Sequence, residues 1–363
     1  MGIKEFKILF DNPVKTYTPG ETVSGRILLD LNSSKKCRGI KIKIKGKALT
    51  RWMLPSANGT QQIRGREKYF SSKFYIAGGV SGEMELHTGE HTFPFEYVLP
   101  PKLPTSYELK LVNTEGHIRY IIKAIIDRPW KFDNETEAPF TVISKYDLNA
   151  DPTASEQVCV EETKKFGIFS NSPPLSVTLS LPFRGYVPGQ IIPITVNVNN
   201  LSGVEVNDIK LKLEMYARYL QVENPYRSLK KNVNITIIET KRTKNNEAVF
   251  SFNHEFRIPP IPPSNIGYTC SIISIEYAIE LEAEVDRMFS RNLKISTPIV
   301  IGTVPLANYL SFVNPSLLTI TPVYEKSMFV VENLWEEDDS KHVMNKIKYA
   351  PKYLFYNFSA FQE

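Results

Sequence analysis

The sequence predicts an all-β protein made of two tandem antiparallel β-sandwiches. Three observations predict it: a Tyr-x-Pro-Gly turn that occurs twice, an alternating apolar and charged strand after each copy, and the near absence of helical periodicity. The turn stands at 17–21 (Tyr-Thr-Pro-Gly-Glu) and again at 186–190 (Tyr-Val-Pro-Gly-Gln). Proline presets φ in such a turn and glycine supplies a positive φ. An apolar, β-branched run follows each copy.

The repeat continues beyond the turns and keeps its register. Residues 40–44 alternate Ile and Lys, and residues 209–213 do the same, 169 residues later, which is also the spacing of the two turns. Two further segments recur at slightly shorter offsets, as differences in loop length would produce. The proline-rich run 99–104 corresponds to 258–263, and the strand 118–120 corresponds to 275–277. We infer two diverged copies of one β domain.

Taken in order, the strands of the first copy are expected near 3–10, 23–30, 38–47, 93–97, 118–126 and 139–143. The polar stretch 51–82 is expected to be a long exposed hairpin or loop region. Pro94 places its strand at a sheet edge or a bulge. The strands of the second copy are expected near 175–181, 191–198, 206–219, 233–240, 247–257, 271–285 and 295–301.

This pattern divides the chain into four parts. We expect a first domain over 1–146, a polar linker over 147–174, a second domain over 175–302 and a tail over 303–363. The tail mixes polar and aromatic residues and carries an acidic cluster at 336–339, so it is expected to be mostly extended or disordered and tethered in places by its aromatics.

Composition excludes several classes of protein. The chain has 363 residues and a formal net charge of +5, which allows two cores and does not suggest a nucleic-acid binder. Neither a signal sequence nor an apolar run long enough to span a bilayer is apparent. Three scattered cysteines, Cys37, Cys159 and Cys270, indicate a reducing compartment without a disulfide framework. The sequence therefore predicts a cytoplasmic protein.

Several longer motifs carry a family resemblance. They include Gly-Glu-His-Thr-Phe-Pro-Phe at 89–95, Arg-Pro-Trp-Lys-Phe-Asp at 128–133 and Gly-Tyr-Val-Pro-Gly-Gln at 185–190. Together with the first turn, Trp52 and Asp-Leu-Asn at 147–149, they resemble the arrestins, and among these the α-arrestins. The resemblance covers residues 3 to about 302. It implies two immunoglobulin-like β-sandwiches, the arrestin fold.

The resemblance also implies a function. Members of that family are cytoplasmic adaptors, peripherally associated with the plasma membrane or endosomes. They link membrane receptors or transporters to HECT ubiquitin ligases, whose WW domains grip Pro-Pro-x-Tyr motifs in the tail. The first hypothesis is therefore an adaptor of endocytic sorting. The second is a ligase-independent sorting scaffold of the same fold, comparable to the arrestin-like subunit of retromer.

The tail departs from the family pattern, and so does the linker. The tail has two Pro-x-Tyr elements, and each is one proline short of the motif. The first contains Pro322 and Tyr324, and the second contains Pro351 and Tyr353. A WW groove holds a preordered polyproline segment, so we expect weak binding with these four residues as the contacts. The linker has only Cys159 where relatives often carry a cysteine cluster suited to palmitoylation.

A row of lysines offers a second candidate surface. Lys41, Lys43, Lys45 and Lys47 alternate along one expected strand and therefore project from one face. Two interpretations stay open: a solvated sheet face, or a basic stripe that contacts phosphorylated tails or anionic lipid. The first strand adds two further candidates, Lys4 and Lys7.

An enzyme is the third hypothesis. His-Thr-Gly-Glu-His at 87–91 matches a zinc-peptidase motif, but that motif needs a helix to bring its histidines together. Gly89 and Pro94 favour a turn that enters a strand instead. We therefore expect no catalytic residues, no metal and no cofactor. Trp130, beside Arg128 and Lys131, is interpreted as structural, with a functional role as the alternative.

Overall fold

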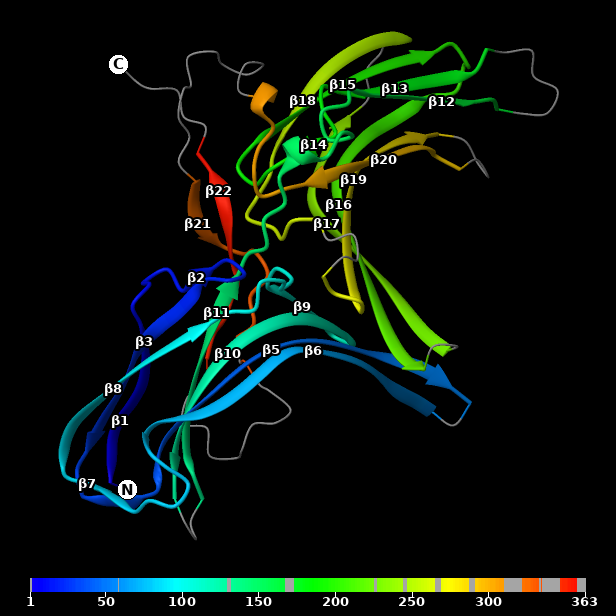
Figure 1. The fold of residues 1–363 in the computed structure, drawn as a ribbon. Coiled ribbons are helices and arrows are strands. Elements are labelled where there is room, and N and C mark those ends of the chain that lie inside the picture. Colours follow the sequence, from blue (N-terminus) through cyan, green and yellow to red (C-terminus); the bar gives the residue numbers. More distant parts are fainter. Residues whose placement is uncertain are drawn as a thin grey trace, which may run out of the picture.

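The computed structural model describes residues 2–57, 59–128, 132–166, 173–224, 227–243, 247–264, 269–286, 291–309, 322–332, 334 and 347–357. Figure 1 shows two β-sandwich domains side by side, the first drawn in blue to teal and the second in green to gold. The tandem sandwich fold predicted from the repeat is confirmed.

The N-terminal domain packs a three-stranded sheet against a larger one. The smaller sheet has the order β1 (Ile3–Phe10), β3 (Thr22–Leu31), β8 (Gly89–Val98). The larger has the order β2 (Thr16–Tyr17), β11 (Asn134–Val142), β10 (Thr114–Asp127), β5 (Gly39–Ser56), β6 (Gly59–Gly78), with β9 (Tyr107–Leu111) beside β10. The short strands β4 (Lys35–Cys37) and β7 (Met84–Leu86) pair with each other.

Two details of this domain match the sequence pattern. Ile40, Ile42 and Ile44 of β5 lie in the core, because a strand turns alternate side chains to opposite faces. Pro94 lies in β8, which is an edge strand, as expected of a residue that lacks a backbone donor. Most of the polar stretch 51–82 lies in a hairpin, since β5 and β6 pair with each other as far as Gly78.

The C-terminal domain has the same plan. One sheet has the order β12 (Val158–Lys164), β13 (Leu175–Leu181), β15 (Ile191–Asn200), β18 (Val249–Arg257). The other has the order β14 (Gly185–Tyr186), β20 (Leu293–Ile301), β19 (Ile273–Val285), β16 (Val206–Asn224), β17 (Arg227–Thr243).

Equivalent hydrogen bonds recur in the two turns. Glu21 accepts from the backbone N–H of Thr18 at 2.7 Å, and Gln190 accepts from that of Val187 at 2.8 Å. The acid or amide of the repeated turn therefore has a structural role, which is to satisfy a turn N–H that no strand pairs. The glycines Gly20 and Gly189 have φ of 86° and 93°, the left-handed region that glycine tolerates.

The long central strands repeat their contacts as well. Tyr120 of β10 donates to the carbonyl of Pro104 at 2.6 Å, and Tyr277 of β19 donates to that of Pro262 at 2.7 Å. Both tyrosines are buried, so each hydroxyl needs this acceptor inside the protein. The proline-rich runs thus supply carbonyls that are free for a side chain because no neighbouring strand takes them.

The region between the domains corrects one expectation. The polar composition of residues 147–174 predicts a linker, but Val158–Lys164 forms strand β12 and pairs with β13 in the second sandwich. Its inward residue Val158 is buried, while the outward side chains that give the stretch its polar character face solvent at a sheet edge. The short 3-10 helix η1 (Leu148–Ala150) precedes it, with its N-cap Asp147 beside Val304.

Two described segments of the tail pair with each other. The strands β21 (Pro322–Lys326) and β22 (Lys352–Tyr356) are antiparallel, so these two segments are extended but also hydrogen-bonded to one another. Figure 1 places this pair beside the junction of the two domains. Its aromatic side chains bury against both domains, which stabilises an element that could not fold alone.

The two sandwiches meet through polar and apolar contacts. The hydroxyls of Tyr107 and Tyr219 lie 2.8 Å apart, and Thr50 donates to the carbonyl of Leu220 at 2.9 Å. In the described part of the chain, no helix is long and apolar enough to cross a membrane.

Candidate functional surfaces

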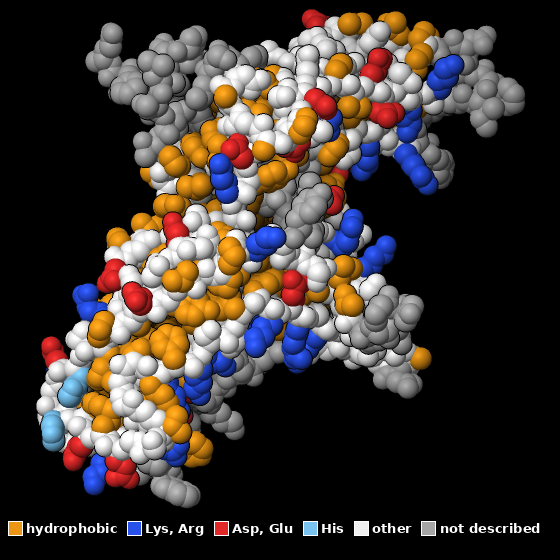
Figure 2. Space-filling view, viewed as in Figure 1, with side chains coloured by type: hydrophobic (Ala, Val, Ile, Leu, Met, Phe, Trp, Pro, Cys, Tyr) orange, Lys and Arg blue, Asp and Glu red, His pale blue; other side chains and the backbone are white. Residues whose placement is uncertain are grey.

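The lysine row on β5 is less exposed than a solvated face would be. Lys45 is buried, so that expectation is wrong at this position. It lies opposite Ile121 of β10, and Leu334 and Tyr349 of the tail pack on Ile121. The tail therefore covers part of the face to which the row belongs. Figure 2 shows Lys and Arg side chains along the lower right edge of the N-terminal domain, over β5 and β6.

Carboxylates pair with three of the candidate lysines. Lys4 lies 2.6 Å from Asp30, and Lys7 contacts Glu5. Lys41 lies 2.5 Å from Asp127, with its ammonium over the ring of Tyr75. Contact of these lysines with phosphate or anionic lipid stays a prediction, and a ligand there would have to compete with those carboxylates.

Burial and ion pairing shift the pKa of Asp127 in opposite directions. Burial by itself would raise its pKa, but hydrogen bonds from Lys41 and Tyr75 favour the ionised form and hold the pKa below its usual value. The pair is therefore ionised at neutral pH. Such a pair fixes the end of β10 against β5 and β6.

A buried ionic cluster lies on the outer face of β10, and sequence reasoning missed it. Arg119 is 2% exposed, and its guanidinium makes two hydrogen bonds to Glu108 of β9, one of them 2.9 Å long. Glu115 contacts Arg51 and His117. A signal was present in the sequence, since charged residues alternate with apolar ones along β10. That signal did not reveal that the tail would cover the face.

The cluster strongly perturbs Glu115. Burial would raise its pKa, but His117, Arg51 and Arg119 outweigh it and lower the pKa to about 2. Further along the same face of β10, Lys123 lies 3.3 Å from Glu135 and 3.8 Å from Glu137. Charges taken out of water are tolerated only when paired in this way. The paired charges hold β9, β10 and β11 together, so we interpret the arrangement as a structural network.

The paired strands β21 and β22, here called the tail hairpin, place the four WW-binding candidates in different environments. Tyr353 is 2% exposed and donates to the carbonyl of Ser106 at 2.9 Å, and Pro351 is buried. Tyr324 is 42% exposed, and Pro322 is half-buried. The hairpin therefore presents only the first Pro-x-Tyr element to solvent.

Further tyrosines anchor the hairpin at both domains. Tyr349 donates to the carbonyl of Phe140 in the N-terminal domain at 3.1 Å. Tyr356 donates to that of Thr303, just after β20 of the C-terminal domain, at 2.6 Å, and its backbone N–H donates to the carbonyl of Pro188 in the second repeated turn. The hairpin thus bridges the two sandwiches.

The zinc-peptidase pattern does not fall on a helix. His87 lies in the turn between β7 and β8, Gly89 has a φ of 116°, and His91 lies in β8. The ring of His91 contacts the backbone carbonyl of His87 at 2.8 Å, so that nitrogen is engaged with the backbone. Within the described ranges, no group of three or more His, Cys, Asp and Glu side chains could hold a metal. Trp130 and Lys131 lie outside the described residues.

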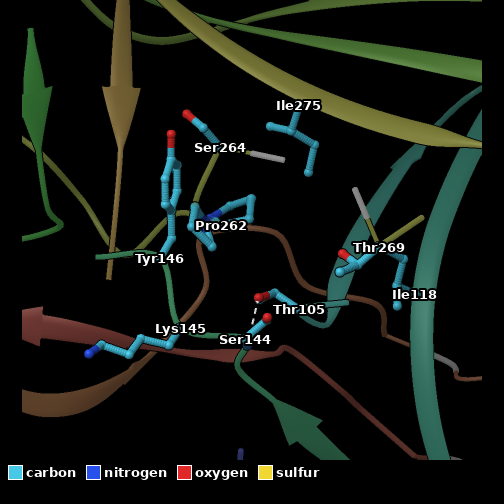
Figure 3. Close-up of a pocket in the computed structure, with 10 residues that line it drawn as sticks. Thr105, Ile118, Ser144, Lys145, Tyr146, Pro262, Ser264, Thr269 and Ile275 are labelled. Carbon is cyan, nitrogen blue, oxygen red and sulfur yellow. Dashed lines mark hydrogen bonds between the residues drawn. The ribbon is translucent and has the colours of Figure 1, made fainter. Parts of the chain in front are cut away.

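A cavity of about 180 Å³ lies at the domain junction (Figure 3). Thr105 and Ser144 line it from the N-terminal domain, where the backbone N–H of Ser144 donates to the Thr105 hydroxyl at 3.0 Å. Pro262 and Ile275 line it from the C-terminal domain. Lys145, Ser264 and Thr269 also line the cavity, so its wall combines apolar and polar side chains.

Comparison with known proteins gives the same two domains. Residues 6–149 match the family model of the arrestin (or S-antigen) N-terminal domain, and residues 171–306 match that of the C-terminal domain. Arrestin domain-containing protein 17 of Caenorhabditis elegans is 31% identical over 326 residues, which cover 85% of this chain and 72% of that protein. The chain belongs to the α-arrestin family.

Mammalian α-arrestins are similar at lower identity. Arrestin domain-containing protein 4 of Mus musculus is 26% identical over 85% of this chain and 74% of that protein. Arrestin domain-containing protein 1 of Rattus norvegicus is 26% identical over 83% of this chain and 65% of that protein. The family resemblance inferred from the motifs is thereby confirmed.

Proposed function

We propose that this α-arrestin is an adaptor of membrane-protein trafficking that links membrane receptors or transporters to endocytic sorting. The observation that carries the proposal is the docked pair of arrestin sandwiches, in which the turns, the central tyrosines and the domain contacts of both halves are present. Two docked domains with outer sheet faces offer surfaces on which a binding function can be built.

Surface levels of membrane proteins in cells test this function. Cells that lack the protein should retain a subset of receptors or transporters at the plasma membrane, and re-expression of the wild type should reverse the change. Quantitative surface labelling measures it. If surface levels are the same with and without the protein, the trafficking role is wrong.

The burial of Tyr353 limits the ligase-linked version of this function to one Pro-x-Tyr element. A WW groove needs the tyrosine ring and the preceding proline at its surface, and here Tyr353 and Pro351 are both covered. Any WW contact of the folded protein would therefore run through Pro322 and Tyr324. This leaves one weak site where two would have supported each other by avidity.

A titration with a protein that carries two tandem WW domains decides between the two versions. We expect weak binding of the full chain that Tyr324→Ala removes and Tyr353→Phe, which keeps the ring packed, leaves unchanged. Absence of binding by the wild type at high micromolar concentration would leave the ligase-independent scaffold as the function.

A further inference from the structure

A basic pocket lies where the tail hairpin meets the N-terminal domain. It has a volume of about 490 Å³, within the range of small-molecule sites. One wall is the loop after β1, with Val14 and Lys15, a second is formed by Pro139 and its neighbours in β11, and the third is the tail. Three segments that are far apart in the sequence thus enclose one space.

The pocket brings together lysines that repel one another. Lys326 of β21 and Lys352 of β22 are direct cross-strand partners, an arrangement that destabilises a sheet when the charges are alike. Lys15 lines the same pocket. The described lining contains no carboxylate, and a fourth lysine, Lys348, pairs with Glu332. An anion in the pocket would relieve this repulsion.

Contacts with the rest of the chain position two of these lysines, Lys352 and Lys15, and the ammonium of Lys15 lies over the ring of Phe10. Lys352 donates to the carbonyl of Val14 at 2.8 Å, which uses one of its three N–H donors and leaves two for a ligand. Burial, with the charges of Lys326 and Lys15, lowers the pKa of Lys352. Lys15 has a φ of 57°, a conformation that costs energy for a residue with a side chain.

We propose that this pocket binds a small phosphorylated molecule, either free in solution or as the headgroup of a membrane lipid, through Lys15, Lys326 and Lys352. Ammonium groups that converge without acidic partners form charge-assisted hydrogen bonds with phosphate oxygens. The volume exceeds the need of a single phosphate group, and Val14 and Pro139 offer an apolar wall to the rest of the molecule. The proposal does not depend on the trafficking function.

A phosphorylated peptide fits the pocket less well. The strand at its back, β11, is bonded to β10 on one side, and β2 pairs with Thr141 and Val142 on the other, so the edge is already occupied where Thr141 lines the pocket. The pocket is also bounded by the loop and the hairpin. A compact ligand therefore suits it better than a peptide that needs a groove.

Calorimetric titration of the full chain with inositol trisphosphate tests the proposal. We expect saturable binding that weakens as salt is added. Lys326→Gln with Lys352→Gln should lower the affinity about tenfold or more, since two charge-assisted bonds are lost. The matched control is Lys230→Gln with Lys231→Gln, which removes the same charge from exposed positions on β17 and should change the affinity less than about twofold. Equal losses in both variants would overturn the proposal.

Two further arms identify the source of the phosphate and guard against misfolding. Recruitment to phosphatidylcholine vesicles that contain phosphatidylinositol bisphosphate, but not to vesicles of phosphatidylcholine alone, assigns a lipid headgroup. Binding of soluble inositol trisphosphate without such recruitment assigns a free ligand.

The Lys326→Gln, Lys352→Gln variant should melt no lower than the wild type without ligand, because a repulsion is removed, and Lys15→Gln should weaken binding independently. If a phosphoserine peptide binds and neither inositol probe does, the proposal is wrong.

Discussion

Arg119 is a charged residue in a buried environment, because its side chain is only 2% exposed to solvent. Its ion pair with Glu108 offsets a desolvation cost of several kcal/mol, and neither partner is tolerated alone. The ion pair therefore helps to fix the register of β9 against β10, in addition to side-chain packing.

Loss of Arg119 should therefore be severe. Arg119→Met leaves Glu108 buried without a partner, and we expect the free energy of unfolding to fall by about 3–5 kcal/mol. Urea unfolding followed by tryptophan fluorescence measures this. The double variant Arg119→Met with Glu108→Gln should recover part of the loss, and a double variant as unstable as the single one would show that the pair itself is not the cause.

Glu115 should make stability depend on pH. Its pKa in the folded protein, about 2, lies below the ordinary value of 4.5, so its contribution is complete above about pH 4.5 and is lost as pH falls towards 2. Melting temperatures of the wild type and of Glu115→Gln should therefore differ most near neutral pH and converge as the solution is acidified. A constant difference across that range would contradict the assignment.

At the scale of elements, the tail hairpin depends on tertiary contacts. Its two strands are only five residues each, too short to be stable in isolation. Tyr349, Tyr353 and Tyr356 supply buried area and satisfied hydroxyls, which stabilise the pair against both domains. The element is therefore a clasp across the domain junction.

A matched pair of tyrosine variants tests the clasp. Tyr353→Ala removes a buried ring and its hydrogen bond, and we expect about 3–5 kcal/mol of destabilisation together with faster proteolysis of the tail. Tyr324→Ala removes a ring that is 42% exposed and should change stability by about 0.5 kcal/mol or less. Thermal melts and limited proteolysis compare the two, and equal effects would contradict a clasp anchored at Tyr353.

At the scale of the whole molecule, the two sandwiches are held by close contacts between large side chains. Gly116 of β10 lies against the ring of Tyr219 of β16, and a Cβ added there would lie 2.4 Å from the ring carbon Cζ. The hydroxyl of the same tyrosine meets that of Tyr107. The docking of the domains therefore depends on Gly116, because a residue with a side chain would not leave room for the ring of Tyr219.

Gly116→Ala should loosen the docking of the domains. The methyl group forces Tyr219 away, and we expect about 1–3 kcal/mol of destabilisation and a larger radius of gyration by small-angle X-ray scattering. Gly79→Ala is the control, because an added Cβ meets nothing within 4 Å there. A radius of gyration unchanged from the wild type would mean that the interface repacks around the methyl group.

The sequence by itself determined the repeated sandwich and the family, because the signals are local. Alternation in β5 and β16 sets which face is buried, and the Tyr-x-Pro-Gly turns set where strands begin, both within a few residues. The same locality misleads at β12, where an edge strand with polar outward residues resembles a linker in its composition.

Only the tertiary structure decided which charged and aromatic residues are accessible. Tyr324 and Tyr353 both stand in a Pro-x-Tyr element, yet one is exposed and the other is buried against Ser106. Likewise Lys45 is covered because the tail packs on the neighbouring strand, and the lysines of the basic pocket meet only after the tail returns to the N-terminal domain. Burial of these groups is set by segments hundreds of residues away in the chain, and no local pattern encodes which distant surface will exclude water from a side chain.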